Sequence, residues 1–288
     1  MSDAEPTRVT DVPKLPPRPK VGHKGTFGRV LVLAGSDAMF GAAVLSGTAA
    51  LRMGSGLVQL ALPKPAVPFA LSITPELISL PLSDGRPDRR RLVEAAERAD
   101  ALVVGPGLGT SRCARARVRR MLALDKPAVL DADALNILAE GEAWPQGVRL
   151  RAVLTPHPGE MGRLAKLLGR SAVPADDDGR LEIAAAAARA FGQVVLLKGA
   201  GTVVTDGARA YVNRTGDSSL SKAGTGDVLS GVIGSLLGQG MDPFDAAALG
   251  AWLHGTAGEA AGRRLGPRAV LARDVIDALG EAARAAEG

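Results

Sequence analysis

Short, continuous runs of Val, Leu and Ala alternate along the chain with longer segments in which apolar residues recur at helical spacing. Runs without intervening polar residues are typical of strands buried on both faces, as in a parallel sheet covered by helices. We therefore predict strands over residues 29–35, 57–62, 101–104, 128–131, 152–155, 194–197, 201–205 and 208–213.

The helical segments predict the layers that cover this sheet. Helices are expected over residues 42–53, 89–98, 111–124, 158–168, 181–191, 227–237 and 245–261, and a last helix begins at Asp274. Strands that alternate with helices indicate an α/β fold, here a three-layer α/β/α domain with a mainly parallel central sheet. The Asp206-Gly207 hairpin signal predicts antiparallel strands at one edge. Residues 1–20, with five prolines, are predicted to be an N-terminal arm, and residues 21–288 to form the domain.

Composition excludes several classes of protein. With 288 residues, 46% of them hydrophobic, the chain can bury a large core and is not disordered. The single cysteine, Cys113, excludes an intramolecular disulfide and a cysteine-based zinc site, and we interpret it as a helix-face thiol rather than a nucleophile. Residues 1–20 lack an apolar segment, and Arg52 interrupts the stretch 38–62, so we expect a cytoplasmic protein without a targeting signal or membrane span.

The net charge of +5 permits a nucleic-acid partner but does not indicate one. Only 3% of residues are aromatic, which leaves few platforms on which bases could stack. The densest basic run would spread around a helix, and consists of Arg112, Arg115, Arg117, Arg119 and Arg120. We interpret it as solvated surface and expect no nucleic-acid or membrane partner.

The segment with the clearest chemistry is the glycine-rich turn over residues 223–226, which opens the apolar helix predicted from Asp227. Glycines let a backbone approach a ligand closely, and the first N–H groups of a helix attract anions such as phosphate. Asp227 stands at the same place and is a plain N-cap carboxylate in the simplest interpretation. An acid beside a phosphate site has a use when it orients the hydroxyl that accepts a phosphoryl group, and we favour this interpretation.

At this point the chain resembles the ribokinase-like superfamily, in which Gly-Thr-Gly-Asp opens such a helix. Further segments in order make it similar to the ADP- or ATP-dependent NAD(P)H-hydrate dehydratases over residues 21–280. These are Lys24-Gly25-Thr26-Phe27-Gly28, residues 32–36, Gly41-Ala42-Ala43, residues 104–109, residues 131–136, the run 154–160 that contains His157-Pro158-Gly159-Glu160, and residues 197–202.

The resemblance implies a repair reaction. NADH and NADPH can take up water across a ring double bond, and the family phosphorylates the S form of the hydrate with ADP or ATP and then eliminates phosphate. Bacterial single-domain members generally use ADP and release AMP, with Mg²⁺ as the cofactor. The resemblance also implies a homotetramer and functional pairing with a separate epimerase, because no residues are available for the epimerase domain that some members carry.

The resemblance further implies roles for individual residues. Asp227 would be the base that contacts the substrate hydroxyl, and Gly224, Thr225 and Gly226 would surround the transferring phosphoryl group. The nucleotide would contact Gly226 and a loop made of Lys198, Gly199, Ala200, Gly201 and Thr202. For Lys198 the alternative is a strand-end lysine that extends its head into water.

Substrate binding is implied for Ala42, Gly107 and His157, together with Asp227. Close strand–helix packing is the alternative for Ala42 and Gly107, and a surface position is the alternative for His157. Glu160 would hold Mg²⁺ through a water molecule, or is simply an acid in a first helical turn.

Three acidic positions stay open. Asp131 and Asp133 follow a predicted strand and either orient the metal's ligands or cap the short helix after the strand. Asp217 stands where the family usually has an asparagine, which would repel an anionic ligand unless the side chain faces away, binds metal, or pairs with Lys222 or Arg214. The main alternative function is a ribokinase-like kinase for a small thiazole or pyrimidine alcohol, and a third is a non-catalytic nucleotide sensor.

Overall fold

The computed structural model describes residues 5–83, 86–170 and 173–287. Within them a ten-stranded sheet has the order β1-β10-β9-β8-β7-β6-β5-β2-β3-β4. The strands are β1 (Thr7–Val9), β2 (Arg29–Leu33), β3 (Leu57–Pro63), β4 (Ile78–Leu82), β5 (Ala101–Val104), β6 (Pro127–Leu130), β7 (Arg151–Leu154), β8 (Val194–Leu197), β9 (Val203–Thr205) and β10 (Arg209–Val212).

Strand pairing confirms the predicted sheet. Every neighbouring pair from β4 to β8 is parallel, whereas β9 is antiparallel to both β8 and β10. The antiparallel strands thus lie toward one edge, as the Asp206-Gly207 turn predicted. The two outer strands, β1 and β4, were not predicted from the sequence.

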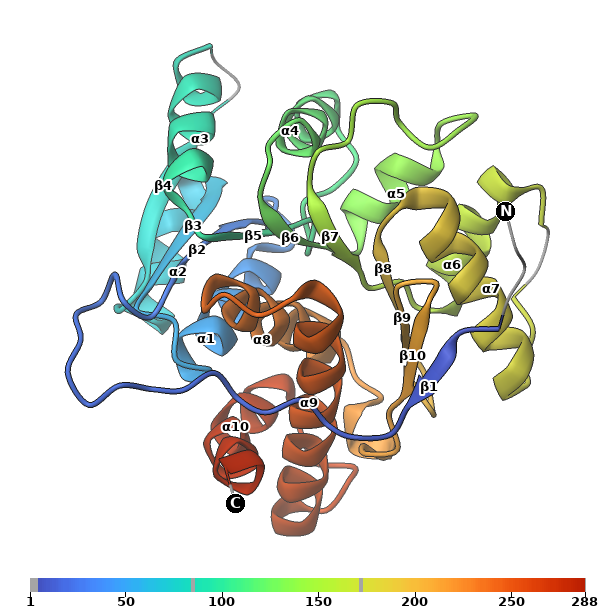
Figure 1. Ribbon diagram of the computed structural model, residues 1–288. Coiled ribbons are helices and arrows are strands. Elements are labelled where there is room, and N and C mark those ends of the chain that lie inside the picture. Colours follow the sequence, from blue (N-terminus) through green and yellow to red (C-terminus); the bar gives the residue numbers. More distant parts are fainter. Residues whose placement is uncertain (1–4, 84–85, 171–172, 288) are drawn as a thin grey trace.

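Helices cover both faces of the sheet (Figure 1). On one face lie α1 (Phe40–Arg52), α2 (Val67–Ile73), α8 (Thr225–Gly238), α9 (Pro243–Leu265) and α10 (Ala272–Glu287). On the other lie α3 (Arg86–Arg98), α4 (Arg112–Leu122), α5 (Asp133–Ala139), α6 (Pro158–Ala165) and α7 (Asp177–Phe191). Short 3₁₀ turns occupy Lys64–Ala66, Lys166–Leu168 and Ser218–Leu220. Cys113 lies on α4, within the helix predicted for it.

The two helical layers explain why the strands are apolar without alternation. In β2, Val30 and Val32 point into the core shared with α1 and α8, and Leu31 and Leu33 into the core shared with α3 and α4. Side chains alternate between the faces of a strand, so a strand covered on both sides needs apolar residues throughout. None of the helices formed by the described residues combines the length and apolar character that crossing a bilayer requires.

The described part of the predicted arm is tied to the domain. Residues Thr7–Val9 form β1, which pairs in parallel with β10, and the chain then passes along the α9 and α1 side of the molecule to reach β2 (Figure 1). Val9, Val12 and Leu15 pack against the core on that side. Arg18 donates to the carbonyl oxygen of Gly54 at 3.0 Å. The division of the chain at residue 20 stays a prediction.

Close packing of α1 on α8 fixes where α8 begins. A Cβ atom on Gly231 would lie 2.1 Å from the carbonyl oxygen of Ser46 and 2.9 Å from the Cβ of Ala49. The Ser46 hydroxyl donates to the carbonyl oxygen of Asp227 at 2.9 Å. These contacts hold the first turn of α8 in place. This turn carries Thr225, Gly226 and Asp227, the end of the glycine-rich segment singled out in the sequence.

Gly231→Ala is expected to destabilise the fold by about 2 kcal/mol, because the added methyl group meets backbone that must move. The matched control is Gly280→Ala on α10, where a Cβ meets nothing within 4 Å. That substitution should be neutral or stabilising by up to about 1 kcal/mol. Thermal unfolding measures both, and equal melting temperatures would contradict the role given to Gly231.

Candidate functional site

Three polar segments meet at the carboxyl ends of β6, β7 and β8. Asp131 follows β6, His157 stands three residues beyond β7, and Lys198 follows β8. These strands are parallel neighbours, so their carboxyl ends lie side by side. Ligands of open α/β sheets bind beyond these ends, which places the candidate site here.

A buried ion pair joins two of these segments. Lys198 Nζ donates to Asp131 Oδ1 at 2.8 Å and lies 3.8 Å from Glu160 Oε2. The second oxygen of Asp131 accepts a hydrogen bond from the hydroxyl of Ser230 at 2.7 Å. Burial disfavours the charged ammonium, but Asp131, Glu160 and Asp227 together raise the pKa of Lys198 above its usual value. Lys198 is therefore a fixed cation, and its alternative as a lysine that extends into water is wrong.

The first turn of α8 lies directly beside this cation. Gly224 is the N-cap residue, with the left-handed φ of 93° that glycine adopts most easily. A Cβ atom on Gly226 would lie 3.5 Å from Lys198 Nζ. The hydroxyl of Thr225 lies within hydrogen-bond distance of the carbonyl oxygens of Leu220 and Lys222, at 2.8 and 2.9 Å. It therefore links the first turn of α8 to the segment that precedes the helix. A helix N-terminus and an ammonium group together form an anion site.

Asp227 is half-buried at the same turn, and its environment makes it basic. Burial and the negative charges of Asp131 and Asp133 raise its pKa to about 7, although the Lys198 ammonium opposes the shift. A carboxylate with a pKa near neutrality can take a proton from a hydroxyl far more readily than an ordinary surface aspartate.

His157 and Glu160 form a reciprocal cap on α6. His157 Nδ1 accepts from the N–H groups of Gly159 and Glu160, and Glu160 Oε2 accepts from the N–H of His157 at 2.8 Å. The histidine side chain is 51% exposed, whereas that of Glu160 is 5% exposed. His157 is therefore a helix cap as well as an exposed group that a substrate can reach. Glu160 lies in the first turn of α6, as its alternative interpretation requires, and its contact with Mg²⁺ through water stays a prediction.

Asp131 and Asp133 do not cap α5. Its N-cap residue is Ala132, without a side-chain hydrogen bond, and Asp131 instead pairs with Lys198. Asp133 Oδ2 accepts from the N–H of Gly109 at 2.7 Å and so holds the loop after β5. Between the two acids, Ala132 has a φ of 51° and a ψ of −114°, a strained backbone for a residue other than glycine. Strain at this point directs the two carboxylates to different partners.

Ala42 and Gly107 lie next to each other, and their contact leaves no room for a side chain at Gly107. A Cβ atom on Gly107 would lie 2.9 Å from the Cβ of Ala42 and 2.7 Å from the carbonyl oxygen of Met39. Strand–helix packing therefore explains Gly107 in this structure. Substrate contact at Ala42 and Gly107 stays a prediction.

A cavity of about 520 Å³ adjoins the anion site. Its walls come from the predicted nucleotide loop, from residues 213–218, and from the α9 residues Ala251, His254 and Gly255. Gly226 also lines it, so the loop and the first turn of α8 face one space. Ala42, Gly107 and His157 are not among its lining residues.

Asp217 lines this cavity without forming either ion pair that was considered for it. Its Oδ1 accepts from the N–H of Ser219 at 2.8 Å and caps the 3₁₀ turn. Lys222 donates to the carbonyl oxygen of Arg268, and Arg214 lies 3.7 Å from Asp177. Asp217 is exposed to solvent, which screens its charge from the cavity.

The oxygen donors at the site suit Mg²⁺ only when water and phosphate complete its ligands. Within the described ranges no group of three or more His, Cys, Asp or Glu side chains is arranged to hold a metal ion. Both oxygens of Asp131 are engaged, and Glu160 already accepts from the N–H of His157. Mg²⁺ usually keeps several waters and binds substrate phosphates, which fits this donor set.

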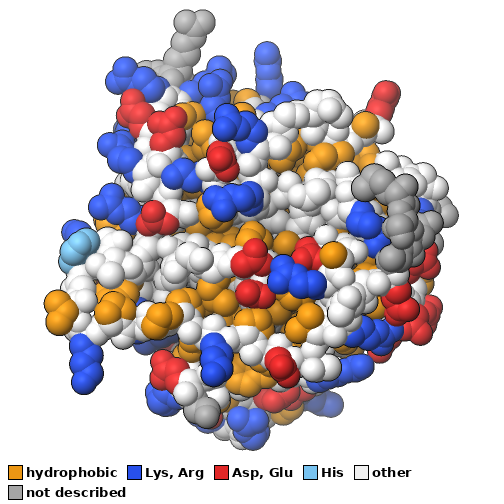
Figure 2. Space-filling view, viewed as in Figure 1, with side chains coloured by type: hydrophobic (Ala, Val, Ile, Leu, Met, Phe, Trp, Pro, Cys, Tyr) orange, Lys and Arg blue, Asp and Glu red, His pale blue; other side chains and the backbone are white. Residues whose placement is uncertain are grey.

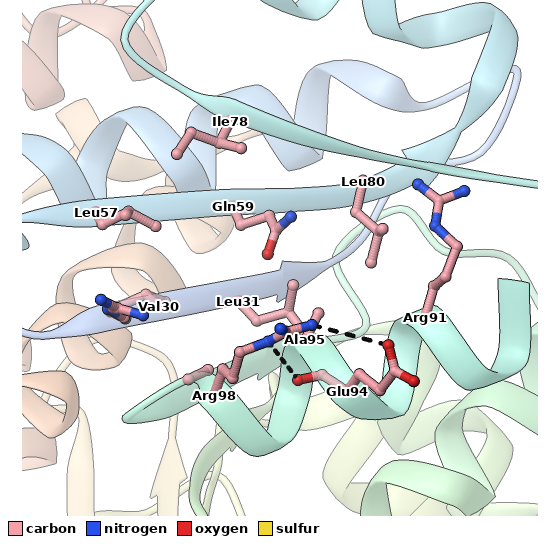
Figure 3. A pocket seen from close by; sticks show the side chains of 12 residues that line it. Val30, Leu31, Leu57, Gln59, Ile78, Leu80, Arg91, Glu94, Ala95 and Arg98 are labelled. Atoms are coloured by element: carbon pink, nitrogen blue, oxygen red, sulfur yellow. Dashed lines mark hydrogen bonds and ion pairs between the residues drawn. The ribbon is translucent and has the colours of Figure 1, made fainter.

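A second hollow lies at the opposite ends of the strands. It is bounded by the first residues of β2, β3 and β4 (Arg29, Leu57 and Ile78) and by α3 (Figure 3). Glu94, the one carboxylate among the described residues that line it, forms ion pairs with Arg90 and Arg98. In the view of Figure 2, Lys and Arg side chains gather around the end of the molecule that carries α3, with acidic groups among them. Among the described residues that line it, this hollow has neither a helix N-terminus nor a carboxylate with a raised pKa. Both are present in the candidate site at the carboxyl ends of the strands.

Sequence reasoning missed two buried groups at the site. The hydroxyl of Ser230 donates to Asp131. The sequence feature that could have pointed to Ser230 is its position one helical turn after Asp227. Arg180 on α7 donates to carbonyl oxygens of the predicted nucleotide loop, and no sequence signal distinguished it from the other arginines.

The fold and this site together define a ribokinase-like α/β protein in which a lysine ammonium and a helix N-terminus lie beside a carboxylate with a raised pKa. The family model for NAD(P)H-hydrate dehydratase matches residues 30–281, and the chain belongs to that family.

The chain is similar to several named relatives. It is 42% identical over 248 residues to the ADP-dependent (S)-NAD(P)H-hydrate dehydratase of Neisseria meningitidis, covering 84% of this chain and 80% of that one. It is 44% identical over 275 residues to the bifunctional NAD(P)H-hydrate repair enzyme of Moorella thermoacetica, covering 92% of this chain and 51% of the relative. The chain thus spans about half the length of the bifunctional relatives it matches.

A solved structure agrees with this assignment. The ADP/ATP-dependent NAD(P)H-hydrate dehydratase of Bacillus subtilis, co-crystallised with ATP/Mg²⁺, superposes with a TM-score of 0.81 at 32% identity, covering 95% of each chain. The prediction of a ribokinase-like dehydratase fold is confirmed.

Asp227→Asn is expected to stabilise the folded protein at pH 8 by about 2 kcal/mol. Because the folded-state pKa is raised to about 7, the ionised carboxylate costs stability above that pH, and the cost disappears as the pH falls toward 4. Melting temperatures of the two proteins at pH 8 and pH 5 measure this, with a larger gain at pH 8. A variant that is less stable at pH 8 would contradict the electrostatics described here.

Proposed function

We propose that this chain repairs hydrated nicotinamide nucleotides. It dehydrates the S form of NADH hydrate and NADPH hydrate to NADH and NADPH, with ADP as the favoured phosphoryl donor, and releases AMP and phosphate. Membership of the dehydratase family supports this activity. The observation that carries it is the basic Asp227 beside the Gly224–Gly226 turn and the Lys198 ammonium, because a hydroxyl and a phosphoryl group can meet there.

In the first step Asp227 accepts the proton of the substrate hydroxyl. The hydroxyl oxygen forms a bond to the terminal phosphorus of ADP, and the bond from that phosphorus to the bridging oxygen breaks, so that AMP leaves. Negative charge develops on the transferring group, where Lys198 and the N-terminus of α8 stabilise it. The carboxylate, the ammonium group and the helix N-terminus are fixed before substrate arrives, so little reorganisation is needed.

In the second step phosphate leaves and the double bond returns. The lone pair of the ring nitrogen assists cleavage of the bond between carbon and oxygen, and the neighbouring ring carbon then loses a proton. Phosphate leaves more readily than hydroxide, so the step needs no strong acid from the protein. In this view the chain contributes mainly orientation, through Asp227, His157 and the small residues Ala42 and Gly107.

Mg²⁺ belongs to this proposal as a neutralising ion for the phosphates. Glu160 would hold it through a bound water, and Asp131 contributes negative charge nearby while its own oxygens stay with Lys198 and Ser230. We also propose a homotetramer in the cytoplasm that works with a separate NAD(P)H-hydrate epimerase. The bifunctional relatives, of which this chain spans about half, support the pairing.

The direct test follows the absorbance band of the reduced nicotinamide. Purified protein with NADH hydrate and Mg²⁺ should restore this band when ADP is added, and more slowly with ATP. Asp227→Asn should lower turnover by about 10³-fold while the protein stays folded, since the general base is lost. A stable phosphorylated product without absorbance would instead identify a hydroxyl kinase, and an active Asp227→Asn variant would exclude Asp227 as the base.

The rate should depend on pH through Asp227. The base must be ionised to accept a proton, so kcat/KM for NADH hydrate should be constant above about pH 7.5 and fall about tenfold per pH unit well below the pKa near 7. AMP affinity measured over the same range is the control, because phosphate groups also titrate there. If kcat/KM stays flat from pH 5.5 to 8 while AMP binding is constant, Asp227 does not act as proposed.

A further inference from the structure

Arg180 is a buried arginine whose hydrogen bonds, among the described residues, all go to backbone carbonyl oxygens. It is 7% exposed. Its Nη1 donates to the carbonyl oxygen of Ala200, and its Nη2 to those of Leu197 and Lys198 at 3.4 and 3.3 Å. In the part of the chain that the structure describes, no carboxylate forms an ion pair with it, and its Nε is buried without a hydrogen bond. For stability alone such a cation is costly.

The guanidinium group lies directly behind the predicted nucleotide loop. Lys198, Gly199 and Ala200 line the cavity, whereas Arg180 is not among its lining residues. A Cβ atom on Gly199 would lie 2.7 Å from Arg180 Nη2, and Gly199 has a φ of 148°. One layer of backbone therefore separates the guanidinium group from the cavity.

We propose that Arg180 is a positioning residue for nucleotide binding. The carbonyl oxygens of Lys198 and Ala200 point toward Arg180. In a trans peptide the C=O and N–H bonds point in opposite directions, and the described chain has no cis peptide bond. The N–H groups of Gly199 and Gly201 consequently face the cavity side of the loop, where they can donate to phosphate oxygens.

The charge of Arg180 adds to this orientation. A phosphate bound in front of the loop would bring an anion close to this buried cation, which forms no ion pair within the described residues. The inference rests on the proposed function, because it assumes that the loop formed by residues 198–202 binds the nucleotide. It adds a residue outside the cavity that determines how well the loop does so.

Arg189 offers a matched control on the same helix. Its Nη1 donates to the carbonyl oxygen of Gly207 at 3.0 Å, so it also holds a glycine turn by a backbone carbonyl. That turn joins β9 to β10 and does not line the cavity. Substituting either arginine removes the same kind of contact, but only one of the contacts supports the nucleotide loop.

The test is AMP binding by calorimetry without metal, with unfolding measured in parallel. Arg180→Met should weaken AMP binding about 10- to 100-fold, as expected for losing charge-assisted contacts, and Arg180→Lys less. Arg189→Met should leave AMP binding within about twofold of wild type. In turnover assays Arg180→Met should raise the KM for ADP and leave the KM for NADH hydrate unchanged.

The outcomes separate the inference from the proposed function. Wild-type protein that binds no AMP would overturn both. If wild type binds AMP and folded Arg180→Met binds it equally well, the positioning role alone is overturned. If Arg180→Met does not fold, Arg180→Lys decides: weakened AMP binding with an unchanged KM for NADH hydrate supports the role, and unchanged AMP binding overturns it.

Discussion

The buried ion pair between Asp131 and Lys198 sets the properties of the whole site. It links the ends of β6 and β8, and through Ser230 it also links them to α8. A lysine buried alone would lose its charge, but the carboxylates keep it protonated beside Gly226. Burial is the main cause of the raised pKa of Asp227, and the negative charge of Asp131 adds to it while the Lys198 ammonium opposes it. The ion pair thus provides a fixed cation for an anion, next to a base that can take up a proton near neutral pH.

The position of this ion pair depends in turn on packing far from any ligand. Lys198 reaches Asp131 only because β6, β7 and β8 are parallel neighbours, and Ser230 reaches it only because α8 lies close to the sheet. Gly234 allows that approach, because a Cβ atom there would lie 2.3 Å from Val103 Cγ2 on β5, and Gly231 leaves room for α1 on another side of α8. Small residues in the core therefore have an effect on chemistry, since they decide where the first turn of α8 lies.

The sequence predicted the inner strands, because each is a continuous apolar run, and it predicted the turn before Asp227 from its glycines. It did not predict β4, in which Ser79 and Pro81 interrupt the run, or β1, a three-residue strand with two polar residues. The pairing of Asp131 with Lys198 joins residues 67 positions apart and follows from strand order, which no local pattern contains. The helix cap formed by His157 was missed for another reason, since histidine is an uncommon N-cap residue.

Several features around the cavity are unfavourable for the protein in isolation. Ala132 has a strained backbone, Asp227 has a raised pKa, and Arg180 is a buried cation with only carbonyl partners. Strain and unpaired charge of this kind persist only where the surrounding structure enforces them, and they often mark functional sites. On the proposed function each has a use: Ala132 directs two carboxylates, Asp227 takes a proton, and Arg180 faces phosphate across the loop. A bound nucleotide would supply the ion-pair partner that Arg180 lacks among the described residues, so binding and the local stability of this loop would be coupled.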